Sequence, residues 1–221
     1  MTQENTREAI ELPKLEFFYD CSSAWSYFAF TRIIPMMQAL NLPIPWRPIL
    51  VGGVFNAVNQ DVYNNRSKMQ TDSSKKRRLD HYLKDIQDWA TLCGVEATVP
   101  PDHPINSVKV MRGAIYAQEQ GLVVPYSRVV FEKYWGGGSV DIVSDRALND
   151  ICKAVGLDTD SFFSAINSQH YKDLLRRNTD ELIERGGFGS PTIFINGDDM
   201  YFGNDRLPLI EYKLKTLLGK S

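Results

Sequence analysis

The spacing of apolar residues changes twice along the 221-residue chain. Apolar and aromatic residues dominate residues 15–20 and, interrupted by two prolines, residues 44–51. Such short apolar runs bounded by small polar residues predict strands, and the prolines favour a sheet edge for the second. We expect Gly52-Gly53 to close that strand. Between the two runs, apolar residues recur at helical spacing from Trp25, and Pro35 is expected to kink or end that helix.

The middle of the chain, residues 61–185, has apolar residues at helical spacing and predicts a series of helices. Ser144 is suited to cap one of them, and Asp158 or Asp160 the next. Gly186-Gly187 is suited to end the last helix, because glycine adopts the left-handed conformation found after helix C-termini.

Strands return in the final part of the chain. Residues 192–195 and 200–202 flank the sequence Asn-Gly-Asp-Asp, which is typical of a β-hairpin turn. A closing helix is predicted from about Asp205, as its N-cap, with Pro208 in the first turn, where no backbone donor is needed. The predicted order is β-α-β, a helical block, and β-β-α.

Composition narrows the class of protein. A formal net charge of −2 lacks the Lys/Arg excess expected for nucleic-acid binding. No apolar run is long enough for a bilayer span, and no apolar signal-peptide core follows Met1. Three widely spaced cysteines exclude a disulfide scaffold, and three histidines without ligand spacing argue against a metal site. We therefore expect a cytoplasmic or organelle-matrix enzyme in a reducing compartment, with no nucleic-acid, membrane or metal partner.

Three motifs carry a resemblance to known proteins. Residues 18–27 resemble the strand-to-helix segment of the DsbA-like family, with Ser23-Ala24-Trp25-Ser26 in place of the redox Cys-Pro-Trp-Cys. Residues 188–192, Phe-Gly-Ser-Pro-Thr, resemble that family's cis-proline loop. Residues 202–206, Phe-Gly-Asn-Asp-Arg, resemble a motif of kappa-class glutathione transferases and 2-hydroxychromene-2-carboxylate isomerases.

The resemblance covers roughly residues 14–218 and implies an α/β, thioredoxin-like fold with a large all-helical insertion. On this basis, residues 13–60 and 186–221 form a discontinuous thioredoxin-like domain, and residues 61–185 form the helical insertion domain.

Ser23 stands at the position of the first redox cysteine, where a helix N-terminus stabilises a thiolate. The resemblance implies that glutathione brings the sulfur, and that the catalytic Ser23 hydroxyl donates a hydrogen bond to its thiolate. The alternative is that Ser23 only caps the helix. Cys21 lacks a second cysteine three residues later, so we expect a buried small side chain and no disulfide chemistry.

The same resemblance implies further glutathione contacts. A cis bond between Ser190 and Pro191 would present the Ser190 backbone to the cysteinyl part of glutathione. Asn204 and Asp205 would hold its γ-glutamyl end. The alternatives are a trans bond, as in most X-Pro pairs, and an N-cap as the only role of Asp205.

The loop and helix after residue 53 supply further candidates. Asn59, or Gln60 beside it, and Arg78 would contact glutathione. Polar side chains expected to contact the substrate are Asn65, Arg66 and Asn106. The alternatives are a solvated basic face around Arg78 and a helix cap at Asn106.

The function implied by the resemblance is a glutathione-dependent isomerase that acts on an aromatic unsaturated carboxylate by reversible thiolate addition. Glutathione would be a regenerated cofactor, the substrate a small aromatic compound, and the assembly a homodimer. One alternative is a kappa-class-like glutathione transferase or peroxidase, which consumes glutathione. A second is a non-catalytic thiol- or peptide-binding protein.

Overall fold

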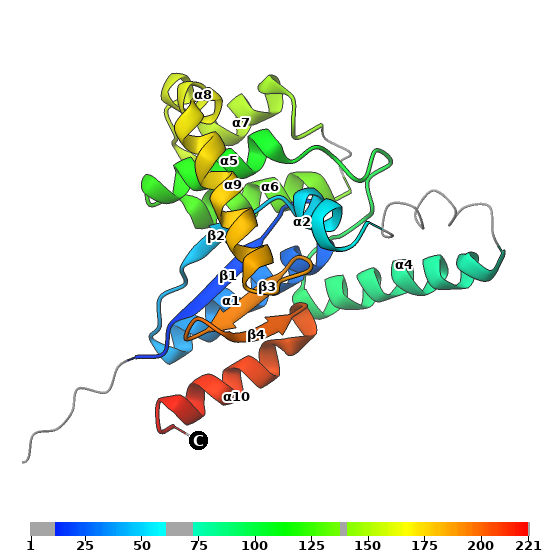
Figure 1. Ribbon diagram of the computed structural model, residues 1–221. Helices are drawn as coiled ribbons and strands as arrows, with labels where there is room; N and C mark the ends of the chain where they lie inside the picture. Colours follow the sequence, from blue (N-terminus) through cyan, green and yellow to red (C-terminus); the bar gives the residue numbers. More distant parts are fainter. Residues whose placement is uncertain (1–11, 61–72, 138–140, 221) are drawn as a thin grey trace, which may run out of the picture.

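A computed structural model describes residues 12–60, 73–137 and 141–220 and contains a four-stranded mixed sheet with helices around it (Figure 1). The strand order is β2-β1-β3-β4. The strands are β1 (Leu15–Tyr19), β2 (Trp46–Pro48), β3 (Thr192–Ile195) and β4 (Asp199–Phe202). β1 runs parallel to β2 and antiparallel to β3, and β3 pairs antiparallel with β4. The two ends of the chain therefore build one sheet.

The helices lie between and after these strands. Their bounds are α1 (Ala24–Leu40), α2 (Val51–Val58), α4 (Ser73–Cys93), α5 (Val108–Glu119), α6 (Val123–Trp135), α7 (Asp145–Val155), α8 (Thr159–Asn167), α9 (Gln169–Glu184) and α10 (Leu207–Leu217). A short 3-10 turn, η1 (Asn204–Arg206), precedes α10. Figure 1 shows α5 to α8 gathered in one block beyond β2 and α10 on the other side, near β4. The predicted domain boundaries remain a prediction.

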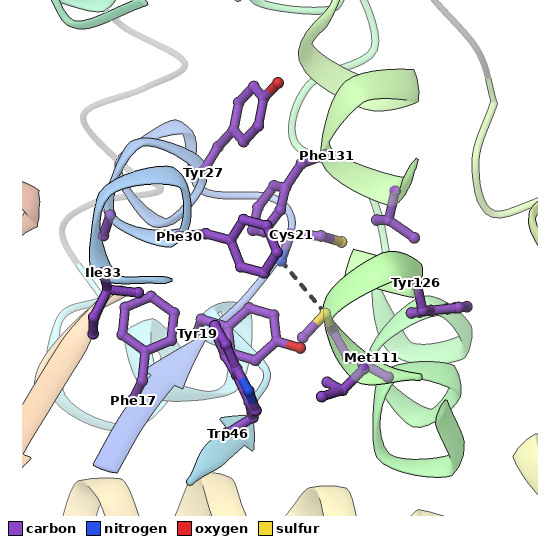
Figure 2. Packing of buried hydrophobic residues seen from close by; sticks show 14 of the residues in the cluster. Phe17, Tyr19, Cys21, Tyr27, Phe30, Ile33, Trp46, Met111, Tyr126 and Phe131 are labelled. Atoms are coloured by element: carbon purple, nitrogen blue, oxygen red, sulfur yellow. Dashed lines mark hydrogen bonds between the residues drawn. The ribbon is translucent and has the colours of Figure 1, made fainter. Parts of the chain in front are cut away.

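Successive side chains of β1 point to opposite faces of the sheet, so the strand contributes to the core on both faces. Phe17 and Tyr19 are fully buried on one face, where they meet α1 and the helical block, and the Phe17 ring packs edge-on against Trp46 at 5.4 Å (Figure 2). Phe18 points to the other face and meets Phe194 at 5.6 Å, in a cluster to which α2 and α9 contribute. Both faces of β1 are therefore covered, which explains its nearly continuous apolar sequence.

Several local predictions are confirmed. The Ser144 hydroxyl accepts from the amide of Ala147 at 3.3 Å at the start of α7, and the Asp158 carboxylate accepts from the amide of Ser161 at 2.9 Å at the start of α8. Gly186, with φ of 85°, follows the end of α9. The hairpin turn is also where it was expected, between β3 and β4.

One prediction near the N-terminus is wrong in part and another is wrong. Pro35 does not end α1: its side chain is exposed while Ile33 and Met37 on either side are fully buried, so packing holds the helix together across the proline. The second strand covers only Trp46–Pro48, and Gly52-Gly53 lies inside α2 instead of closing a strand. The amide of Val51, the first residue of α2, is bound by the distant carboxylate of Asp20 at 2.9 Å, which local sequence does not reveal.

The predicted N-cap role of Asp205 is also wrong. The chain turns at Gly203, with φ of 100°, and η1 begins directly after it. Asp205 is therefore already inside a helical turn, and Arg206 precedes the first residue of α10. Within the described ranges, no helix is long and apolar enough to cross a membrane.

Candidate functional site

A cavity of about 1260 Å³ opens where the N-termini of α1 and α2, the helix α4 and the segment before α5 meet. Much of its wall is aromatic or proline, with a few polar groups between. The polar lining residues are Ser22, Ser23, Asn59, Arg78, Tyr82, His103, Asn106, Ser107 and Ser190. A concave, mainly apolar surface with a small number of placed polar groups is typical of a small-molecule site.

Ser23 lies at the N-terminus of α1 and lines this cavity. Its hydroxyl oxygen accepts from the amide of Ser26 at 3.3 Å and donates to the carbonyl of Ser190 at 2.8 Å. Ser23 is thus a helix cap, as the simpler alternative held. The cap also places the hydroxyl at the positive end of the helix, where an anion is stabilised, so capping and a role in chemistry are compatible.

The Ser190–Pro191 bond is cis, as predicted. The Ser190 side chain, which the sequence argument left without a role, accepts from the amide of Asp20 at 2.9 Å and shares a hydrogen bond of 2.7 Å with the hydroxyl of Ser26. Ser26 occupies the position of the second redox cysteine. The hydrogen bond between Ser26 and Ser190 therefore joins α1 to the loop before β3. A disulfide-exchanging protein needs a thiol at the position of Ser26.

Asp20, at the end of β1, was missed as a site residue. Its carboxylate is fully buried, and one oxygen accepts from the amide and the hydroxyl of Ser22 at 2.9 and 3.0 Å. The other oxygen accepts from the amide of Val51 and the hydroxyl of Ser107, both at 2.9 Å. Burial raises the pKa of Asp20, while the hydrogen bonds oppose that rise. A charged residue closing an aromatic strand is the signal that marks it.

Three predicted residues line the cavity together with Ser23 and Ser190: Asn59, Arg78 and Asn106. Arg78 is exposed on α4. The Asn106 side chain accepts from the amide of Val108, the first residue of α5, at 3.2 Å, while the N-cap residue of that helix is Ser107. The predicted substrate contacts Asn65 and Arg66 lie outside the described residues.

Asn204 and Asp205 are not part of the cavity lining. Asn204 is buried, its carbonyl accepts from Arg32 at 2.9 Å, and its side-chain nitrogen has no hydrogen-bond partner among the described residues. Asp205 is exposed and pairs with Arg206 at 2.8 Å. The preceding residue, Gly203, donates from its amide to the carbonyl of Pro191 at 3.1 Å, which ties this loop to the segment that carries Ser190.

An aromatic pair at the rim of the cavity was not predicted. The rings of Phe188 and Phe202 lie 4.6 Å apart, line the cavity and remain 42% and 38% exposed. A Cβ atom on Gly189 would lie 2.6 Å from the Phe202 ring, so only glycine allows this approach. Each phenylalanine is the first residue of a motif that carried the resemblance, and this position was the available signal.

Cys21 is a core residue, as expected. It is 1% exposed, burial raises the pKa of its thiol well above the usual range, and its backbone amide points at the sulfur of Met111, 3.4 Å away (Figure 2). A buried thiol with a raised pKa is a poor nucleophile. In the part of the chain that the structure describes, no group of three or more His, Cys, Asp or Glu side chains is placed to hold a metal ion.

Strand order, a capped helix following β1 and a cis-proline loop beside its N-terminus define a thioredoxin-like fold with helices inserted between β2 and β3. The chain belongs to the family of DSBA-like thioredoxin domains, whose profile matches residues 14–215. The predicted fold class is therefore confirmed.

The predicted relatives are also confirmed. A 2-hydroxychromene-2-carboxylate isomerase of Pseudomonas putida is 31% identical over 198 residues, which cover 89% of this chain and 92% of that protein. Glutathione S-transferase kappa 1 of Rattus norvegicus is 24% identical to this chain, and the match covers 90% of each protein. A solved structure of 2-hydroxychromene-2-carboxylate isomerase superposes with a TM-score of 0.75 at 28% identity, covering 92% of this chain and 95% of that one.

Proposed function

We propose that the chain is a glutathione-dependent isomerase of an aromatic unsaturated carboxylate, similar to the 2-hydroxychromene-2-carboxylate isomerases. The observation that carries the proposal is the position of Ser23. Its hydroxyl caps α1 at the wall of an aromatic cavity, while serine, not cysteine, occupies both positions of the former redox pair. Such a site is suited to activating a thiol that comes from a bound molecule.

The residues present fit glutathione. The Ser190 carbonyl is already a hydrogen-bond acceptor at the cavity, and the N-terminus of α1 favours an anion. The buried side-chain nitrogen of Asn204, which has no partner in the described structure, is a donor suited to a carboxylate after adjustment of its loop. The Asp205 carboxylate suits an ammonium group, and Arg78 with Asn59 suits a carboxylate. When bound, glutathione supplies a nucleophilic thiolate at the place where this chain has Ser23 and not a cysteine.

Each wall of the cavity then has a task. The Ser23 hydroxyl turns from the Ser190 carbonyl and donates to the thiolate, whose charge it stabilises together with the free amides of α1. Phe188 and Phe202 stack against an aromatic substrate and exclude water. Asn106 is a described polar residue of the lining that is suited to a substrate carboxylate.

The test uses 2-hydroxychromene-2-carboxylate as the probe substrate, with and without glutathione, and follows both the substrate spectrum and the glutathione concentration. We expect conversion only with glutathione, and no loss of glutathione after many turnovers. Conversion without any thiol refutes the proposal. Cys21→Ser is the matched control, because it removes a sulfur near Ser23 that lies in the core, and it should retain turnover.

A second candidate is a glutathione transferase, favoured by the match to the kappa-class enzyme of Rattus norvegicus. In that case glutathione is consumed in proportion to product, so the same assay distinguishes the two functions. Unchanged probe together with measurable glutathione binding supports a non-catalytic binding protein.

We extend the proposal to a cytoplasmic homodimer. The homodimer is supported by apolar surface on α4 and α10, where Leu92, Leu209 and Tyr212 are 68%, 55% and 68% exposed. Light scattering should give about twice the chain mass of 25.2 kDa. A monomer at micromolar concentration contradicts the dimer and leaves the isomerase proposal standing.

A further inference from the structure

We propose that Asp20 is a positioning residue: it is buried outside the cavity lining and holds four separate segments of that lining in their relative places. This role concerns the shape of the cavity and holds whichever reaction the protein catalyses. Only the ligand-binding arm of the test rests on the proposed function.

The carboxylate binds three residues, and all three line the cavity while Asp20 itself does not. They are Ser22 in the turn before α1, Val51 at the start of α2 and Ser107 before α5. The backbone amide of Asp20 adds a fourth lining residue, Ser190 before β3.

The four contacts reach across the chain. Ser22 is two residues from Asp20, but Val51, Ser107 and Ser190 are 31, 87 and 170 residues away. α2, which starts at Val51, supplies Gly52, Gly53 and Phe55 to the lining. Displacement of the Val51 amide would therefore move a whole wall and not one side chain.

The chemistry of Asp20 indicates that it fixes the positions of its partners more than it stabilises the fold. A buried carboxylate is costly unless it is fully hydrogen-bonded, and a buried charge is weak support for stability compared with an apolar residue. What four directed donors provide is a fixed geometry. Asn in place of Asp keeps the volume but turns one acceptor into a donor, which would face either the donors from Ser22 or those from Val51 and Ser107.

A merely structural role is the rival explanation, and the chain offers a matched pair of variants to separate the two. Ser107→Ala removes one buried hydrogen bond of 2.9 Å to Asp20 and keeps the Asp20 side chain itself. Ser127→Ala removes one buried hydrogen bond of 2.7 Å, to the hydroxyl of Tyr19, from a serine outside the lining. Each variant removes one hydrogen bond from a buried polar group, and in Ser107→Ala the Asp20 carboxylate keeps its bonds from Ser22 and Val51.

Amide hydrogen exchange followed by mass spectrometry is the primary readout, since it needs no ligand. In Ser107→Ala and in Asp20→Asn we expect exchange about tenfold faster than wild type in residues 49–58 and 22–26. Ser127→Ala should leave these segments within about twofold of wild type, because its hydrogen bond joins the Tyr19 hydroxyl and no residue that lines the cavity. If Asp20→Asn does not fold, Ser107→Ala decides alone.

Equal exchange patterns in Ser107→Ala and Ser127→Ala, or an even loss of protection along the chain, overturn the proposal. Calorimetric titration with glutathione is the second arm. Ser107→Ala should weaken binding about fivefold or more and Ser127→Ala less than twofold. If wild type itself binds no glutathione, the proposed function fails, and hydrogen exchange still decides the role of Asp20.

Discussion

Replacing Ser23 by alanine removes two hydrogen bonds of one hydroxyl, and the chain contains a second serine with the same two contacts. Ser23 accepts from the amide three residues later at 3.3 Å and donates to the Ser190 carbonyl at 2.8 Å. Ser144, at the N-terminus of α7, also accepts from the amide three residues later at 3.3 Å and donates to the Asp141 carbonyl at 2.9 Å. Ser144 does not line the cavity.

The two alanine variants should therefore lose similar stability. Loss of an N-cap costs about 1 kcal/mol, and loss of an ordinary hydrogen bond also costs about 1 kcal/mol. Because some of this loss is recovered by water, we expect 1–2 kcal/mol for each variant, roughly 2–8 °C in melting temperature for a chain of this length. Activity should separate them. Ser23→Ala should reduce turnover about 10²-fold or more, the scale for one charge-stabilising donor, and Ser144→Ala less than about twofold.

The assay is turnover of the probe substrate at 25 °C with saturating glutathione, alongside thermal unfolding of both variants. Saturation ensures that a change in rate is not a change in glutathione binding. If Ser23→Ala and Ser144→Ala retain equal activity at equal loss of stability, Ser23 is a helix cap without a part in the chemistry.

Three further predictions test the thiol site, the packing and the buried acid. Ser23→Cys should form a mixed disulfide with oxidised glutathione, seen as a mass increase of the intact protein, because the helix N-terminus acidifies the new thiol; no adduct would contradict thiol binding there. Gly113→Ala should lower the free energy of unfolding in urea by about 1–3 kcal/mol, since its Cβ would contact the Tyr126 hydroxyl and lie 2.7 Å from the Phe162 ring; an unchanged midpoint contradicts this tight packing. Burial raises the pKa of Asp20, so between the two pKa values the folded chain keeps a proton that the unfolded chain has released. The free energy of unfolding of wild type, relative to that of Asp20→Asn, should therefore fall as pH rises from about 4 through the folded-state pKa. Urea unfolding at stepped pH measures this difference, and a constant or rising difference contradicts the raised pKa.

Features that depend on near neighbours were predictable. The caps at Ser144 and Asp158 each join a side chain to an amide three residues along the chain. The hairpin between β3 and β4 needs only residues with positive φ at its turn, and Asn196 and Gly197 supply them. The motif around Ser23 was recognisable because the strand, the turn and the helix are consecutive.

The errors and omissions share one cause. α1 passes through Pro35 because buried packing on both sides outweighs a local break. α2 starts at Val51 because a distant carboxylate binds its amide, and Asp205 lost its cap role because the turn at Gly203 begins the helical path earlier. In each case a tertiary contact or a backbone angle overrode the local preference of the residue.

For this protein, the amino-acid sequence alone determined the order of elements, which depends on periodicity and on residues a few positions apart. The thioredoxin-like class and the choice of Ser23 came from the resemblance of three short motifs to a known family, and each motif lies within ten consecutive residues. Only the tertiary structure decided which segments enclose the cavity, since Asp20 binds residues 31, 87 and 170 positions away. A buried carboxylate accepts hydrogen bonds from whichever donors the fold brings within about 3 Å, and the identity of those donors is not written in its neighbours.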